Sequence, residues 1–199
     1  MSKVTRVTAK RAVTERRAAT HARLVDAATK VVARRGFHAA TVDAIADEAG
    51  YSVGALYSNF KGKDDVFLAV FDGHLRWYTD QLEAARDAPV PAQAFRDWLD
   101  GLTRDPEQLL VFIEFWAYAV RKPKLRRHFA SRMRGIRATL AGMIDERAEA
   151  NGAELPIPSA TLAVVLLALW RGLALEKLAD PEAVDDAVTD LVASLVPPR

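Results

Sequence analysis

The chain has 199 residues, half of them hydrophobic and 27% charged, a balance typical of a soluble globular protein of one or two domains. Cysteine is absent, which excludes a disulfide framework, a thiolate metal site and a cysteine nucleophile, and the four histidines lack metal-ligand spacing. The net charge of +2 is uneven: residues 1–63 carry +7 (12 Lys and Arg, 5 Asp and Glu) and residues 64–199 carry −5.

The N-terminal segment, residues 1–19, is basic and polar, and it has no apolar core of the kind a signal peptide needs. We expect a flexible arm here. Two interpretations stay open: the arm touches DNA phosphates or the minor groove, or it is a solvated tail. Deleting residues 1–12 and measuring the affinity and its salt dependence separates them.

Apolar residues recur at helical spacing along the whole chain, and neither period-2 alternation nor a hairpin turn signal is sustained. The sequence therefore predicts an all-α fold. The turn and capping signals divide it into about nine helices, near residues 24–35, 41–49, 52–60, 64–82, 95–102, 106–120, 125–151, 159–178 and 181–195. We expect a DNA-binding domain over 20–64 and a C-terminal domain over 65–199.

Residues 41–60 form two short predicted helices around a tight turn. Thr41 and Ser52 are N-cap residues, and Gly50 stands where the chain needs a left-handed conformation. Small Ala46 suits the close approach of two crossed helices. This layout is that of a helix-turn-helix, whose second helix enters the major groove of DNA.

The second of these helices carries little bulk on its outward face, which favours a close approach to base edges. Asn59 is a partner for adenine, and Ala55 for a thymine methyl group. At the helix end and just beyond, Tyr57, Lys61 and Lys63 are placed to contact phosphates. A generic helix hairpin with Tyr57 in packing is the competing interpretation.

The segment 49–66 resembles the signature of TetR-type transcriptional repressors, most specifically in Leu56-Tyr57, Phe60-Lys61 and Lys63-Asp64-Asp65-Val66. The helix that begins near Leu24 and ends at Gly36, and the Thr41-Val42 entry, match as well. The resemblance covers about residues 20–70, whereas the rest matches in length and helix number. Ser58-Asn59 departs from the aromatic-His pair of many members, which leaves the individual base contacts open.

The resemblance implies a role for each matching position. Thr41, Tyr57, Lys61 and Lys63 would hold the DNA backbone. The base-facing residues would be Val53, Gly54, Ala55, Ser58 and Asn59. It also implies a homodimer on a palindromic operator, joined through the last two helices, and a C-terminal domain whose small-molecule ligand releases the DNA by changing the spacing of the two recognition helices.

The last two predicted helices are so apolar that their surface must be buried against another one, and a second copy of the chain supplies such a surface. Burial within one chain is the alternative. We expect the dimer, since a single half-site binds DNA weakly. The predicted interface residues are Leu166, Leu169, Leu173, Val184, Val188, Leu191 and Leu195.

Aromatic residues and methionines of the C-terminal domain are candidates to line a pocket for a mostly apolar ligand. The charged member, Glu114, lies on an otherwise apolar helix and would meet a polar group of the ligand. Plain core packing is the competing interpretation for each of them. The candidates are Trp98, Phe112, Glu114, Phe115, Trp116, Met133, Ile136 and Trp170.

Other classes of protein fit less well. A Ser/His/Asp set, paired carboxylates and a Gly-rich phosphate loop are all missing from plausible contexts, so we expect neither an enzyme nor a cofactor, and no metal. A helical scaffold or ligand carrier without DNA leaves the coincidence of basic charge and helix-turn-helix unexplained. The longest apolar run, 162–170, is too short to span a membrane, and we expect a cytoplasmic protein that joins the nucleoid when bound to DNA. An activator stays as open as a repressor.

Overall fold

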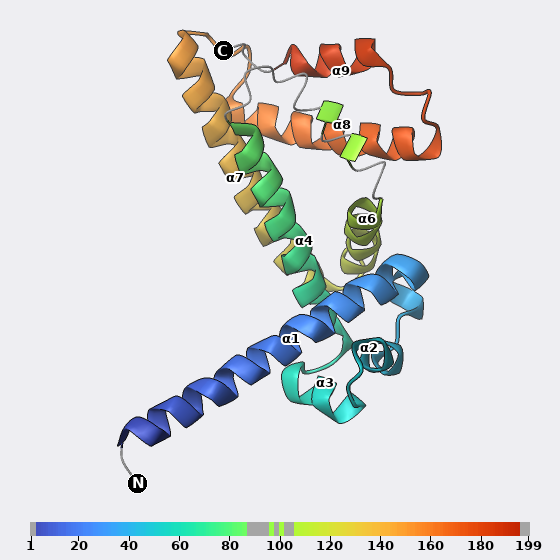
Figure 1. Cartoon of the computed structure of the whole chain (residues 1–199). Coiled ribbons are helices and arrows are strands. Elements are labelled where there is room, and N and C mark those ends of the chain that lie inside the picture. The colour runs from blue at the N-terminus through green and yellow to red at the C-terminus, as the bar shows by residue number, and fades with distance from the viewer. Residues whose placement is uncertain (1–2, 87–95, 98–99, 102–105, 196–199) are drawn as a thin grey trace. The chain divides into compact units, whose positions relative to one another are not determined.

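The structure of the chain is a computed structural model that describes residues 3–86, 96–97, 100–101 and 106–195. All regular structure within these residues is α-helical, as the sequence predicts (Figure 1). Eight helices are present there, against the nine or so expected. They are α1 (Lys3–Ala39), α2 (Val42–Ala49), α3 (Val53–Asn59), α4 (Lys63–Arg86), α6 (Glu107–Ala119), α7 (Pro123–Asn151), α8 (Ser159–Ala179) and α9 (Asp186–Ala193).

The chain divides into two compact units, each with its own contacts. The first contains Met1–His74 together with Val111–Leu125, and the second contains Leu75–Leu110 together with Arg126–Arg199. The boundary expected at residue 64/65 therefore lies inside the first unit. The reason is that the first part of α4 and most of α6 pack with helices α1 to α3.

The N-terminal segment differs from the flexible arm that we expected, because α1 is already helical at Lys3. Residues 3–35 contain neither Gly nor Pro and are rich in Ala, Arg and Lys, which are strong helix formers. The apolar stripe of α1 then provides the core of the helix-turn-helix. Its buried residues are Leu24, Ala27, Ala28, Val31 and Val32.

Helix α1 is interrupted at Gly36, where the sequence predicts a stop. The backbone there has φ 73° and ψ 163°, a conformation that is essentially reserved for glycine. One further helical turn follows, and the N–H of Phe37 at its start donates to Glu114 Oε2 at 3.0 Å. The Phe37 ring is fully buried and packs edge-on against Phe67, with ring centroids 4.3 Å apart.

In the second unit, α4 and α7 lie side by side and are joined by an ion pair between Arg86 and Glu146 (Figure 1). Helix α9 begins later than predicted. Asp180 ends α8 instead of starting α9, and its side chain accepts from the N–H of Glu182 in a turn. The N-cap of α9 is Asp185, whose carboxylate accepts from the N–H of Val188 at 3.0 Å. Both aspartates carry capping signals, so the sequence pattern fits either start.

Candidate nucleic-acid interface

Helices α2 and α3 form the predicted helix-turn-helix, and its capping residues are confirmed. Thr41 caps α2 by accepting from the N–H of Ala44 at 3.1 Å, and Ser52 caps α3 by accepting from the N–H of Ala55 at 3.2 Å. Gly50 ends α2 in the left-handed conformation, with φ 70° and ψ 30°. These local bonds fix where α3 starts and in which direction it runs.

Packing against α1 decides which face of α3 points outward. Leu56 and Phe60 are buried, as are Ile45 and Ala46 of α2. An ion pair between Arg34 and Glu48 joins α1 to α2 on the surface. The opposite face of α3 exposes Gly54, Tyr57 and Ser58, while Val53, Ala55 and Asn59 are half-buried. Apart from Tyr57 these residues are small or uncharged polar, so the exposed backbone of α3 can approach another surface closely.

Asn59, the predicted partner for adenine, is turned toward its own helix. Its Nδ2 donates to the carbonyl of Ala55 at 2.8 Å, and the Ser58 hydroxyl donates to the same carbonyl at 2.7 Å. The buried Oδ1 of Asn59 has no hydrogen-bond partner among the described residues. A buried amide oxygen without a partner costs free energy. The Asn59 Nδ2 also donates to the Ser58 hydroxyl at 3.3 Å, so a rotation that brings Asn59 to a base edge gives up two hydrogen bonds and relieves this cost.

The four predicted phosphate contacts differ in how free they are. Tyr57 is 57% exposed, and Lys61 and Thr41 are exposed as well. Lys63 is half-buried and already has partners in its own chain: its Nζ donates to the carbonyl of His38 at 3.0 Å and lies 5.1 Å from the centre of the Phe67 ring. Burial, and then the neighbouring Lys122, lower the pKa of Lys63.

Contacts between α1 and the end of α3 went unnoticed in the sequence. Arg17 Nη2 donates to the carbonyl of Ser58 at 3.0 Å, and the rings of His21 and Phe60 have centroids 4.5 Å apart. The hydroxyl of Thr20 lowers the pKa of Tyr51, which follows the turn. The sequence does hold a signal for these contacts, because positions 17, 20, 21 and 24 share one helix face. Only Leu24 of this set is apolar, so the apolar pattern alone does not mark the face as a contact surface.

Helix α6 is joined to the DNA-binding helices through a polar cluster at the start of α4. The Tyr118 hydroxyl donates to Asp64 Oδ1 at 2.7 Å, and Lys122 Nζ donates to the same oxygen at 2.8 Å. Burial raises the pKa of the Asp64 carboxyl, but these two hydrogen bonds outweigh it and leave that pKa below its usual value. With the Glu114–Phe37 bond, they join most of α6 to the first unit.

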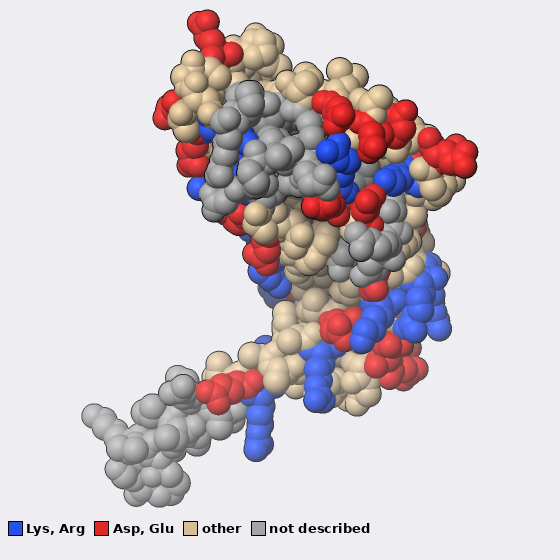
Figure 2. Space-filling view, turned by 45° about the horizontal axis from the view of Figure 1, so that its top comes forward, with Lys and Arg blue, Asp and Glu red and all other residues tan. Residues whose placement is uncertain are grey.

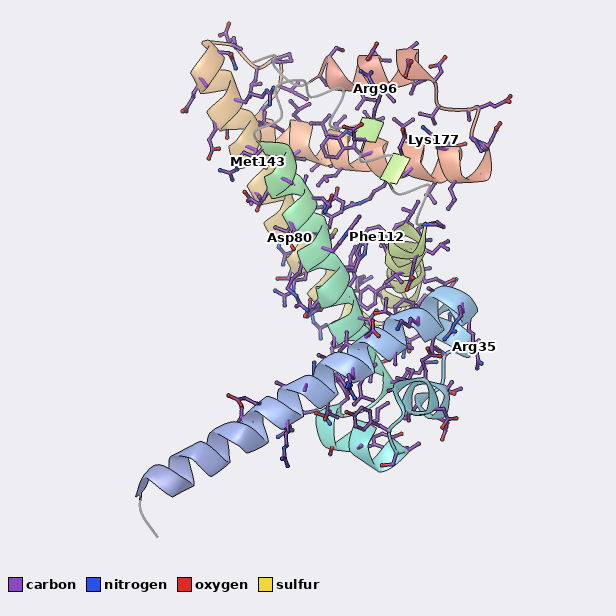
Figure 3. The ribbon with its side chains drawn as sticks, viewed as in Figure 1. Arg35, Asp80, Arg96, Phe112, Met143 and Lys177 are labelled. Atoms are coloured by element: carbon purple, nitrogen blue, oxygen red, sulfur yellow. The ribbon has the colours of Figure 1, made fainter. Side chains whose placement is uncertain are left out.

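The predicted pocket residues fall into both units, and the structure gives them different surroundings. Phe115 is fully buried and stacks on Phe71 with ring centroids 4.1 Å apart, whereas Phe112 points toward Phe71 and His74 of α4 (Figure 3). Trp116 is 50% exposed, which does not suit a pocket lining. Glu114 is occupied by the N–H of Phe37.

The remaining pocket candidates belong to the second unit. Met133 and Ile136 are buried on α7, and Trp170 is half-buried on α8. Arg171 Nη2 lies 3.4 Å from the sulfur of Met133. Trp98 lies outside the described residues. As pocket residues, all of these stay predictions.

Two of the predicted interface residues face the interior of their own chain. Leu166 is fully buried and Val184 is 6% exposed, so neither can meet a partner. Leu169, Leu191 and Leu195 are exposed, and Leu173 and Val188 are half-buried. The exposed apolar face of α8 follows a different register from the predicted one and contains Val164, Val165, Ala168, Leu169, Gly172 and Leu175.

Basic side chains are concentrated in the first unit and acidic ones in the second, in line with the uneven charge of the sequence. In Figure 2, Lys and Arg side chains project from the helices of the first unit, and Asp and Glu side chains gather over α9. Exposed cations of the first unit include Arg16, Arg17, Arg23, Arg34, Arg35 and Lys61.

In the parts of the chain that the structure describes, none of the helices has the length and apolar character of a membrane span.

The N-terminal and C-terminal regions of the chain each match a known protein family. Residues 24–70 match the model of bacterial regulatory proteins of the tetR family, and residues 92–197 match the C-terminal domain of BetI-type transcriptional repressors. The HTH-type transcriptional repressor Rv1474c of Mycobacterium tuberculosis is 29% identical over 189 residues, covering 90% of this chain and 94% of that protein.

Two further similarities point the same way. The HTH-type transcriptional activator FasR of Mycolicibacterium smegmatis is 38% identical over 88 residues, which cover 39% of each protein. The chain spans less than half the length of the first curated relatives that it matches. Among solved structures, the regulator FadR of Bacillus subtilis, in complex with stearoyl-CoA, has the same fold, with a TM-score of 0.69 and 19% identity over 87% of this chain and 95% of that one. The family models together cover the helix-turn-helix and more than half of the chain, which therefore belongs to the TetR family of bacterial regulatory proteins, with a C-terminal domain of the BetI type.

Proposed function

We propose that this protein is a sequence-specific DNA-binding transcriptional repressor that acts as a homodimer on a palindromic operator. The observation that carries the proposal is the capped α2–α3 pair, whose second helix presents small residues and the exposed Tyr57 to solvent. A helix with this face fits the major groove, and the basic first unit supplies the attraction to phosphates. Membership of the family supports the same mode of binding.

Selection of bound duplexes from a random pool tests the proposal directly. We expect a palindromic motif whose half-site centres are one DNA turn, about 34–36 Å, apart. Affinity for the selected duplex should fall steeply with salt, since phosphate contacts release counterions. A helical ligand carrier without DNA-binding activity would select nothing at low salt, which separates that rival from the main proposal.

The homodimer is supported by the apolar face of α8 and α9. Leu191 is 68% exposed on α9, and Val164, Val165 and Leu169 are exposed on α8. Exposed apolar side chains on both helices favour an interface, and a second copy of the same helices would close a two-fold dimer. Sedimentation equilibrium at micromolar concentration should give twice the chain mass of 21.9 kDa.

The effector is proposed to be a small molecule with a long apolar part that weakens operator binding. The FadR relative was solved with stearoyl-CoA, and the second unit of this chain buries Met133 and Ile136, apolar side chains of the kind that line such sites. Acyl-CoAs of increasing chain length, titrated into the protein–operator complex, should release the duplex. Free CoA is the control and should leave the complex intact.

A further inference from the structure

Arg17 connects the N-terminal helix to the last turn of α3, a contact between residues 41 positions apart. Its guanidinium donates to the carbonyl of Ser58 at 3.0 Å. The carbonyls of a final helical turn lack partners within the helix and carry partial negative charge. The last turn of α3 contains no basic residue of its own, and Arg17 of α1 brings a cation to this end.

The neighbouring turn of α1 strengthens the same junction. His21, four residues after Arg17, packs its ring on Phe60, the C-cap residue of α3. Leu24, one turn further, is fully buried. One face of α1 thus runs from the core of the helix-turn-helix to the C-terminal end of α3, which lies beside the middle of α1 (Figure 1).

We propose that Arg17 is a positioning residue for sequence reading: it orients the C-terminal end of α3, so that Ser58 and Asn59 meet their base pairs in register. This inference rests on the proposed DNA-binding function. Ser58 accepts the bond from Arg17 through its backbone, and Asn59 is the next residue, so a shift of this end displaces both side chains. The N-terminal helix then contributes to specificity, beyond the charge that it brings to the DNA.

A purely electrostatic role makes a different prediction. Removal of a cation that only binds phosphate lowers affinity for all duplexes by one factor and reduces the salt slope by about 0.9 for each phosphate that is no longer neutralised. Removal of a positioning residue lowers the preference for the correct base. A wrong base pair costs about 1–3 kcal/mol, which corresponds to about 5- to 150-fold in affinity.

The test uses the full chain and the selected operator, with two further duplexes: one changed at a base pair read by Ser58 and Asn59, and one random. In Arg17→Ala, the ratio of the affinities for the operator and for the duplex with the changed base pair should fall to about threefold or less. The affinity for the random duplex should change by less than about threefold. Arg17→Lys should keep the random-duplex affinity and recover part of the discrimination. Arg16→Ala removes the same charge one residue away, on another face of α1, and should leave the discrimination intact.

An equal loss on all three duplexes for Arg17→Ala, or the same loss of discrimination in Arg16→Ala, would overturn the inference. If Arg17→Ala loses its helical circular dichroism, Arg17→Met decides, because methionine keeps a long side chain and helix propensity but has no hydrogen-bond donor: unchanged discrimination in that variant rejects the positioning role. A wild-type protein without any preference among the three duplexes would instead reject the proposed function itself.

Discussion

Replacement of Gly36 by alanine should destabilise the first unit strongly, for two separate reasons. At φ 73° and ψ 163° a residue with a Cβ is strained by about 1–3 kcal/mol. That Cβ would also lie 2.9 Å from Oε2 and 3.1 Å from Oε1 of Glu114. The carboxylate must then move and weaken its 3.0 Å bond to the N–H of Phe37, at a further cost of about 1 kcal/mol.

Together these terms predict a decrease of about 2–4 kcal/mol in the free energy of unfolding. For a chain of 199 residues, 1 kcal/mol corresponds to about 2–4 °C, so the melting temperature should fall by about 4–16 °C. Thermal unfolding followed by circular dichroism measures it. Gly135→Ala is the matched control: Gly135 lies within α7 with open space around its Cβ, and alanine there should stabilise by about 0.5–1 kcal/mol.

A double-mutant cycle separates the two reasons. In a Glu114→Ala background the close contact is gone, so Gly36→Ala should cost only the backbone strain. A Gly36→Ala variant that melts with the wild type would refute the whole argument. If Gly36→Ala lowers the free energy of unfolding equally in the wild-type and Glu114→Ala backgrounds, backbone strain explains the whole effect and the contact with Glu114 is rejected.

Three other changes address the DNA surface, the dimer and the interior. Tyr57→Ala should weaken binding to every duplex roughly tenfold through loss of a hydrogen bond to a charged phosphate, about 1.5 kcal/mol, and equal binding would remove Tyr57 from the interface. Leu191→Glu should give a monomer in sedimentation equilibrium, whereas Val120→Glu, also at an exposed apolar residue, should stay dimeric; a dimeric Leu191→Glu contradicts the α8–α9 interface. Burial raises the pKa of Tyr78 from 10.0 to about 12, so its stabilising contribution, about 3 kcal/mol, is present below pH 10 and is lost as the pH rises to 12. Tyr78→Phe should show a smaller drop in its urea midpoint between pH 9 and pH 12, and the same drop as the wild type would argue against this burial.

The parts of the fold that local chemistry controls were predictable from the sequence. Thr41 and Ser52 cap helices through their own side chains, and Gly50 supplies a left-handed residue, so each acts within a few residues of its position. The break of α1 at Gly36 follows from the same kind of signal. These features were enough to predict where α3 begins, whereas packing against α1 decides which of its residues are exposed.

Contacts across long stretches of sequence were not predictable in this way. Glu114 reaches Phe37 over 77 positions, and Arg17 reaches Ser58 over 41. The exposed face of α8 was missed for another reason: α8 is apolar on most faces, so no polar stripe tells the buried Leu166 from the exposed Val165. The start of α9 was misplaced because Asp180 and Asp185 carry similar capping signals.

The insertion of α3 into the major groove is open to a direct measurement, since the chain contains no native cysteine. Ala55→Cys, labelled with a short photo-crosslinker, should attach to bases at two positions of the selected operator, related by its two-fold symmetry. Ala138→Cys with the same label should give no attachment, because Ala138 is exposed on α7, outside the helix-turn-helix. Equal crosslinking from both positions, or attachment at Ala55 scattered along any duplex, would contradict the reading of base edges by α3.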